Sequence, residues 1–187
     1  MENCAKYYPA SLSKDEIVNE MIGHDHAGAH EHGASTIDNV IEDDHVELNL
    51  EGALSNFLSF EYAPKSDQDL KEVAFLNQQF QHVGDLFELT ETADCSVKTI
   101  ALGSDVITAE HLSENLADLA VGYKPNETHG NLFAKIVWQC NKPNALSSLK
   151  INLFEYFPNM EHITVQMLTP KGQKSAELSE SMTKIEW

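Results

Sequence analysis

The sequence predicts an α+β fold, with antiparallel sheets of about seven short strands and one or two helices. Three observations predict this class. Apolar and polar residues alternate in several short segments, as is typical of strands with one face in water. One longer segment repeats its apolar residues with the period of a helix. Because the strand segments follow one another through short links, we expect neighbouring strands to pair in antiparallel fashion.

The first half of the chain is expected to begin with a β-hairpin. Its strands are residues 35–41 and 45–50, because apolar and polar residues alternate in the second of them. A helix of about four turns follows, with Ser66 as its N-cap, Asp69 completing a small capping pattern and Gly84 closing it.

The second half is expected to consist mainly of strands. Residues 95–102 are the first of these, residues 103–105 form a turn, and residues 108–121 have a weak helical pattern. The remaining predicted strands, of which the last two form a hairpin, cover residues 131–140, 151–157, 162–168, 174–178 and 182–187.

The chain length fits one domain with an appendage. At about 150 residues per domain, 187 residues leave a short extra segment. We expect residues 1–33 to be a flexible, histidine-rich N-terminal segment and residues 34–187 to be a single α+β domain.

A weak internal repeat relates two halves of this domain. A His-Gly pair at residues 32–33 precedes a strand and is followed by FEYAP at residues 60–64. A second pair at residues 129–130 also precedes a strand and is followed by FEYFP at residues 154–158. If these are pseudo-repeat halves, a twofold relation brings both His-Gly turns to the same edge.

The charge balance excludes several classes of partner. Lys and Arg number 12 against 30 Asp and Glu, which gives a net charge of −18. Such a chain repels nucleic acid and anionic membrane surfaces and attracts cations. No apolar run reaches the roughly 18 residues of a membrane span. No signal peptide is visible either, so the chain is cytosolic or its signal peptide has been removed.

A histidine cluster near the N-terminus predicts a metal site. Imidazole is a common ligand of zinc and also suits copper and nickel. Alternate side chains of an extended chain lie on one side, about 6.6 Å apart, so two can converge on one ion. The alternative is a solvated polar segment. The histidines of the cluster are His24, His26, His30 and His32.

His129 is the best candidate for a fixed ligand from the folded domain. It stands directly before a predicted strand, as His32 does. A fixed ligand reduces the ordering entropy that flexible histidines lose on binding. The alternative is an ordinary loop residue. His45 is a weaker candidate, on the expectation that it lies near the cluster's end of the hairpin.

The three cysteines are Cys4, Cys95 and Cys140. Cys95 begins one predicted strand and Cys140 ends another, so antiparallel neighbours bring them close together. They then form a disulfide, which would indicate an oxidising compartment, or a pair of buried thiols, or thiolate zinc ligands. Motifs typical of hydrolases, of P-loop proteins and of dinucleotide binding are absent, so we expect no enzymatic activity.

Two stretches carry a resemblance to a known family. Residues 149–173 follow the pattern L-x-I-x-L-F-E-Y-F-P-x-M-x-x-I-x-V-Q-M-L-T-P-x-G-Q, and the first half contains H-E-H-G and N-F-L-S-F-E-Y-A-P. Together with Cys95 and Cys140 they resemble the ZrgA-like family of zinc-regulated bacterial periplasmic proteins. The resemblance spans residues 24–187.

The resemblance implies a periplasmic zinc-binding protein that works alongside an ABC-type zinc importer. It implies a disulfide between Cys95 and Cys140, and metal-binding roles for His30, His32 and His129. The chain departs from relatives in two ways. The stretch where they carry a long His/Asp-rich insert, residues 103–130, holds only two histidines, and Tyr62 stands where relatives often have histidine.

The leading hypothesis is a periplasmic accessory protein whose histidines capture Zn²⁺ for import or buffering. Residues 34–187 are then a metal-binding domain, with zinc ions and components of a zinc ABC importer as partners. Four cluster histidines exceed what one site with His129 requires, so metal-bridged self-association is also plausible. The alternatives are a nickel, cobalt or copper chaperone and a metal-independent interaction module.

Overall fold

The computed structural model describes residues 32–124 and 126–187. The fold is α+β, as predicted. A seven-stranded sheet has the order β5-β4-β6-β2-β1-β8-β9, and a three-stranded sheet has the order β10-β7-β3. Among the described residues, none of the helices is both long enough and apolar enough to span a membrane.

Most of the secondary structure lies in the large sheet. Its strands are β1 (Ala34–Glu42), β2 (His45–Ala53), β4 (Cys95–Ser104), β5 (Ala117–Asp118), β6 (Asn131–Cys140), β8 (His162–Thr169) and β9 (Gly172–Ser179). The small sheet contains β3 (Phe87–Leu89), β7 (Ser148–Ile151) and β10 (Lys184–Glu186). The helices are α2 (Asp67–Gln81), α3 (Val83–Leu86), α4 (Ala109–Leu112) and α5 (Leu153–Tyr156), with 3₁₀ turns η1 (Leu54–Asn56), η2 (Glu91–Ala93) and η3 (Pro143–Ala145).

The predicted hairpin is β1 and β2, which pair in antiparallel register from Ser35 and Gly52 to Glu42 and His45. Asp43 takes a positive φ of 52° at the turn, a conformation that Asp tolerates better than most residues. The large sheet is nevertheless mixed, because β1 pairs in parallel with β8 and β4 with β5. The chain reaches β8 after passing through the small sheet and α5, a long crossover of the kind that parallel pairing requires.

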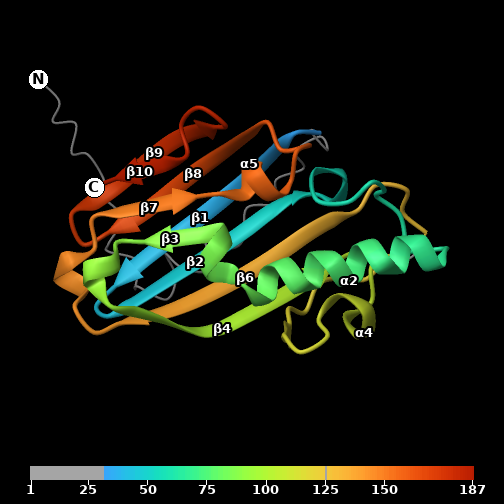
Figure 1. Cartoon of the computed structure of the whole chain (residues 1–187), viewed down its shortest axis with the longest axis horizontal. Helices are drawn as coiled ribbons and strands as arrows, with labels where there is room; N and C mark the ends of the chain where they lie inside the picture. Colours follow the sequence, from blue (N-terminus) through green and yellow to red (C-terminus); the bar gives the residue numbers. More distant parts are fainter. Residues whose placement is uncertain (1–31, 125) are drawn as a thin grey trace, which may run out of the picture.

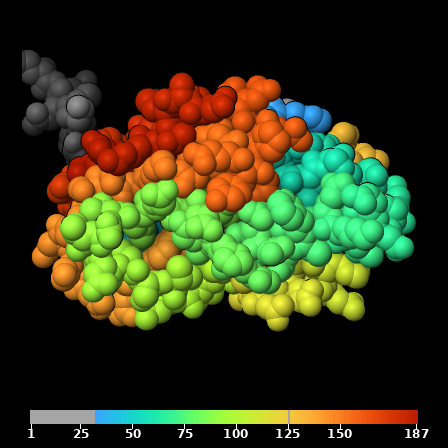
Figure 2. Space-filling view, in the orientation of Figure 1, coloured from blue at the N-terminus to red at the C-terminus, as the bar shows by residue number. Residues whose placement is uncertain are grey.

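One face of the large sheet is covered by α2 and the small sheet. Figure 1 shows both in front of β2 and β6, and Figure 2 shows their side chains closing over this face. Helix α2 buries Val73, Leu76 and Phe80. Phe87 of β3 contacts Trp138 of β6 edge-on, with 6.5 Å between ring centroids. The core therefore lies between the two layers.

The start of α2 is as predicted. The Ser66 hydroxyl accepts the Asp69 N–H at 3.1 Å, and the Asp69 carboxylate accepts the Ser66 N–H at 3.2 Å. This is a capping box. The helix ends at Gln81, and Gly84, expected to close it, lies within the short helix α3.

Two predicted elements are wrong in part. The strand over residues 151–157 stops at Ile151, and the next residues form helix α5, which buries Leu153 and Phe154. A continuous apolar run fits a buried strand and a buried helical turn equally well. The weak helix over residues 108–121 is limited to Ala109–Leu112, and the positive φ of 64° at Asn115 is incompatible with its continuation.

Several other boundaries and paths differ from expectation. Gly103 and Ser104, predicted as part of a turn, belong to β4. The two segments of the weak repeat also take different paths. After the first His-Gly pair, β1 and β2 both lie in the large sheet. After the second pair, β6 lies in the large sheet but β7 lies in the small sheet. The division into residues 1–33 and 34–187 stays a prediction, since residues 1–31 lie outside the described part.

Cys95 and Cys140 form a disulfide between directly opposed positions of β4 and β6. Of the three possibilities left open for this pair, the disulfide is therefore correct. It lies where β6 ends, at the opposite end of that strand from His129. Cys4 lies outside the described residues.

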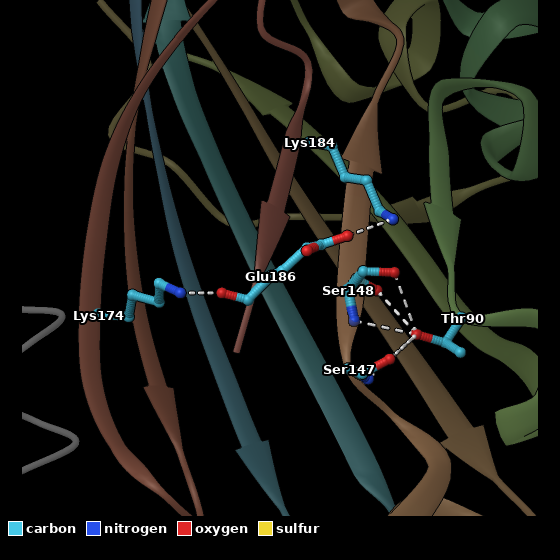
Figure 3. A network of polar contacts seen from close by, with 6 residues as sticks. All are labelled: Thr90, Ser147, Ser148, Lys174, Lys184 and Glu186. Atoms are coloured by element: carbon cyan, nitrogen blue, oxygen red, sulfur yellow. Dashed lines mark hydrogen bonds and ion pairs between the residues drawn. The ribbon is translucent and has the colours of Figure 1, made fainter.

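The C-terminal strand ties the two sheets together. Figure 3 shows Lys174 of β9 donating to the main-chain carbonyl of Glu186 in β10. The Glu186 carboxylate accepts from the Lys184 ammonium at 2.6 Å. Directly after β3, the Thr90 hydroxyl accepts the N–H groups of Ser147 and Ser148, both at 3.0 Å. The Lys174 contact thus joins β10 to the edge strand β9 of the large sheet, and the Thr90 contacts join the end of β3 to the start of β7.

Candidate metal centre

Both His-Gly turns lie at the same end of the central strands of the large sheet. Strands β1 and β6 each pair in antiparallel fashion with β2, so their first residues flank the last residues of β2. His32 precedes β1 and His129 precedes β6. The segment that leaves β2, residues 54–61, passes along the same end of these strands and ends in Glu61. We call residues 54–61 the bridging segment.

The turn after His32 is held by the backbone of Gly33 and by the bridging segment. Gly33 has a φ of +83°, which glycine adopts without strain. Its N–H donates to Asn56 Oδ1 at 2.7 Å. Its carbonyl accepts the N–H groups of Glu161 and His162 at 2.7 and 3.0 Å. The chain therefore enters β1 in one fixed direction.

The turn after His129 is held by Gly130 in a similar way. The Gly130 carbonyl accepts the Leu54 N–H at 2.8 Å, and its N–H donates to the Glu61 carbonyl at 2.7 Å. A Cβ at this position would meet Val106 Cγ2 at 2.2 Å and Leu54 Cδ1 at 2.9 Å. Only glycine allows the chain to pass this close to the bridging segment.

Glu61 lies between the two histidines. Its Oε1 is 3.0 Å from His32 Nε2, and its Oε2 is 2.5 Å from His129 Nδ1. The Glu61 side chain is 10% exposed, whereas those of His32 and His129 are 64% and 57% exposed. The carboxylate thus forms the floor of a shallow site, and the imidazoles form its rim.

The surroundings of Glu61 favour the ionised carboxylate. Burial on its own raises the pKa of Glu61, but the Ser55 hydroxyl, the His129 ring and the charge that His32 carries when protonated act against it. The net effect is a pKa below the ordinary value of 4.5. Glu61 is therefore negatively charged at neutral pH and attracts a cation or a protonated imidazole.

The three side chains fit a zinc ion. One ligand atom from each of His32, Glu61 and His129 lies within 4.8 Å of the others. Tetrahedral zinc with bonds of about 2.0–2.1 Å holds its ligands roughly 3.3 Å apart, so small rotations bring them to bonding distance. Three protein ligands with an open fourth position are typical of zinc sites that exchange a ligand.

A proton and a metal ion compete for the same positions in this site. Without metal, a protonated His129 Nδ1 donates a hydrogen bond to Glu61 Oε2 at 2.5 Å, and a protonated His32 Nε2 forms an ion pair with Glu61 Oε1 at 3.0 Å. A metal ion requires the lone pairs of the same nitrogens, so it must displace these protons. Glu61 then changes from an acceptor of hydrogen bonds to a ligand.

The structure brings together two of the five predicted ligands, His32 and His129. The other three, His24, His26 and His30, lie outside the described residues. The expectation for His45 is wrong: it pairs with Glu42 at the far end of the hairpin, and its Nδ1 lies 2.7 Å from Asp44 Oδ1.

Glu61 is the member of the cluster that sequence reasoning missed. It stands in the FEYAP segment that marks both the internal repeat and the family resemblance. That segment is the available signal, but within it the resemblance draws attention to Tyr62, which stands where relatives often have histidine. Tyr62 itself packs against Phe60, with 5.2 Å between ring centroids, and beneath Lys65.

A family model described as "ZrgA family zinc uptake protein" matches residues 29–187. None of the curated proteins matches the sequence. The matched range includes His30, His32, Glu61 and His129.

Proposed function

Because the chain belongs to the ZrgA family of zinc uptake proteins, we propose that it is a periplasmic accessory protein that captures Zn²⁺ for import or buffering. The ion binds at His32, Glu61 and His129. The observation that carries the proposal is the convergence of these three side chains, with ligand atoms within 4.8 Å, at the end of the central strands. Zinc is here the cargo, and the protein is not an enzyme.

The exposed rim of the site suits a protein that loads and releases its ion. The imidazoles of His32 and His129 are more than half exposed, so the fourth coordination position faces the solvent. A ligand from outside the cluster can enter there and replace a bound water by ligand exchange. Components of a zinc ABC importer are the proposed recipients.

The histidines near the N-terminus are proposed to extend this site. His30 lies two residues before His32, within about 6.6 Å of chain when extended, so it is the nearest candidate for the fourth ligand. His24 and His26 then serve as further capture residues. A cluster with more histidines than one ion requires also allows an ion to bridge two molecules.

A periplasmic location is supported by the disulfide. Cys95 and Cys140 are bonded, and disulfides persist in oxidising compartments such as the periplasm. This bond suggests an extracytoplasmic location, of which the periplasm is the specific form proposed here.

A nickel, cobalt or copper chaperone is the alternative. Two imidazoles and a carboxylate bind zinc, nickel and cobalt, but the metal-binding cluster found among the described residues holds no thiolate or thioether, the ligands that Cu(I) prefers. Metal analysis of protein purified from its native compartment distinguishes these ions. A metal-independent interaction module would contain none of them in stoichiometric amount.

Calorimetric titration with zinc tests the proposed function. We expect the intact chain to bind about one ion at the composite site, His129→Ala and His32→Ala to bind much more weakly, and deletion of residues 1–31 to weaken binding less than either. His45→Ala is the matched control, because His45 is an exposed histidine beside a carboxylate at the far end of the sheet. Equal losses from His45→Ala and His129→Ala would refute a specific site.

A further inference from the structure

We propose that Asn56 is a positioning residue of the metal site, which holds His32 opposite Glu61 without contacting the ion. This inference rests on the proposed function, because it concerns the same three ligands. It adds a buried residue of the bridging segment to the groups on which zinc affinity depends.

Within the described part of the chain, the side-chain hydrogen bonds of Asn56 reach the residues directly after His32. The residue is 1% exposed. Its Oδ1 accepts the Gly33 N–H at 2.7 Å, and its Nδ2 donates to the Ala34 carbonyl at 2.6 Å and to Ser35 Oγ at 3.2 Å. One side chain therefore holds three consecutive residues at the start of β1.

Asn56 links the position of His32 to that of the other two ligands. It is the last residue of η1, and Leu54, the first residue of that turn, bonds to Gly130 beside His129. Glu61 lies at the other end of the same bridging segment. Loss of Asn56 would therefore leave Glu61 and His129 together but loosen the turn that carries His32. That turn would then be held mainly by the bonds from Glu161 and His162 to the Gly33 carbonyl.

The exposure of His32 makes this support necessary. A side chain that is 64% exposed has few packing contacts to fix it, so its position depends on the backbone that carries it. A ligand that must be ordered on binding reduces affinity by the entropy it loses. Groups that orient ligands commonly change metal affinity by about ten- to hundredfold when they are removed.

Asn77 provides a matched control. It is 3% exposed, its Nδ2 donates to the Leu112 carbonyl at 2.5 Å, and its Oδ1 accepts from Gln81 at 2.6 Å. It is thus a buried, hydrogen-bonded asparagine that joins α2 to α4 rather than to the site. Asn77→Ala should cost stability without changing zinc affinity.

The test is a double-mutant cycle on the full chain. Zinc dissociation constants and urea unfolding are measured for the intact chain, Asn56→Ala, Asn77→Ala, His32→Ala and the double variant His32→Ala/Asn56→Ala. We expect Asn56→Ala to weaken zinc binding by about ten- to hundredfold and to have no further effect once His32 is absent. If Asn56→Ala does not fold, Ser35→Ala is tested in its place. Ser35→Ala removes only the 3.2 Å hydrogen bond from Asn56 Nδ2 to Ser35 Oγ, so we expect it to weaken zinc binding by about two- to tenfold.

Two results would overturn the inference. One is an unchanged zinc affinity in Asn56→Ala, or in Ser35→Ala if that variant has to be used. The other is a loss of the same size with and without His32, which would indicate a general structural role. Both presuppose an intact chain that binds zinc; a chain that binds none refutes the proposed function itself, and this inference with it.

Discussion

Glu61 joins the two histidines of the site and is its least exposed member. Its separation from His129 is 68 residues along the chain, so no local pattern relates them. The sequence did predict His32 and His129 as ligands, because histidines are conspicuous before strands. An acidic residue is not conspicuous in a chain with 30 of them, and only the path of the bridging segment brings Glu61 to the two histidines.

Replacement of Glu61 should therefore impair binding more than replacement of a supporting residue. We expect Glu61→Gln to weaken zinc affinity by more than about a hundredfold, the upper range for supporting groups, because an amide carries no charge to offset that of the ion. Calorimetric titration measures the change. Glu47→Gln is the control, because Glu47 forms an ion pair with Lys135 at 2.7 Å within the sheet and is not part of the site. The Glu47→Gln variant should bind zinc with the affinity of the intact chain.

Zinc affinity should fall as the pH drops from about 7 to about 5.5. Metal ions bind the neutral imidazole, and an unperturbed imidazole is protonated below about pH 6.5. Glu61 does not titrate in this interval, because its pKa lies below 4.5. Titrations at several pH values measure the effect, and a constant affinity across this range would contradict ligation by histidine.

The same lowered pKa predicts the acid sensitivity of the metal-free fold. The folded-state pKa of Glu61 lies below its ordinary value of 4.5, so ionised Glu61 stabilises the fold above that value. This stabilisation is lost as the pH falls through the folded-state pKa. Urea unfolding at pH 6 and pH 3 measures the loss, and Glu61→Gln should show less of it than the intact chain.

The elements with clear periodicity could be predicted from the sequence. Alternation gave the hairpin, β6 and β8, and the capping pattern gave the start of α2. The helical turn α5 could not be separated from a strand, because its residues form a continuous apolar run. The parallel pairing of β1 with β8 could not be predicted either, since it depends on the path of the chain through the second layer.

The bridging segment predicts an effect of Gly130 on both stability and binding. Gly130→Ala should destabilise the fold by about 1–3 kcal/mol, because the new methyl group meets Val106 and Leu54. It should also weaken zinc binding by moving His129 away from Glu61. Thermal unfolding and titration measure both. Gly84→Ala is the control, as it meets nothing within 4 Å and should bind zinc normally.

Across the whole molecule, the disulfide and the metal site lie at opposite ends of β6. Replacing Cys95 and Cys140 by alanine removes a crosslink between positions 45 residues apart. The chain-entropy model gives a loss of about 4 kcal/mol in the free energy of unfolding, which urea unfolding measures. Zinc affinity under native conditions should stay unchanged. A large loss of affinity in a variant that still folds would mean that the two ends of the sheet are coupled.

The most direct test of the composite site is a crystal structure of the zinc-loaded chain with anomalous diffraction at the zinc absorption edge. We expect an anomalous peak bonded to His32 Nε2, a carboxylate oxygen of Glu61 and His129 Nδ1, at about 2.0–2.2 Å from each. A peak that lacks either Glu61 or His129 as a ligand, or the absence of a peak at this end of the central strands, would contradict the composite site.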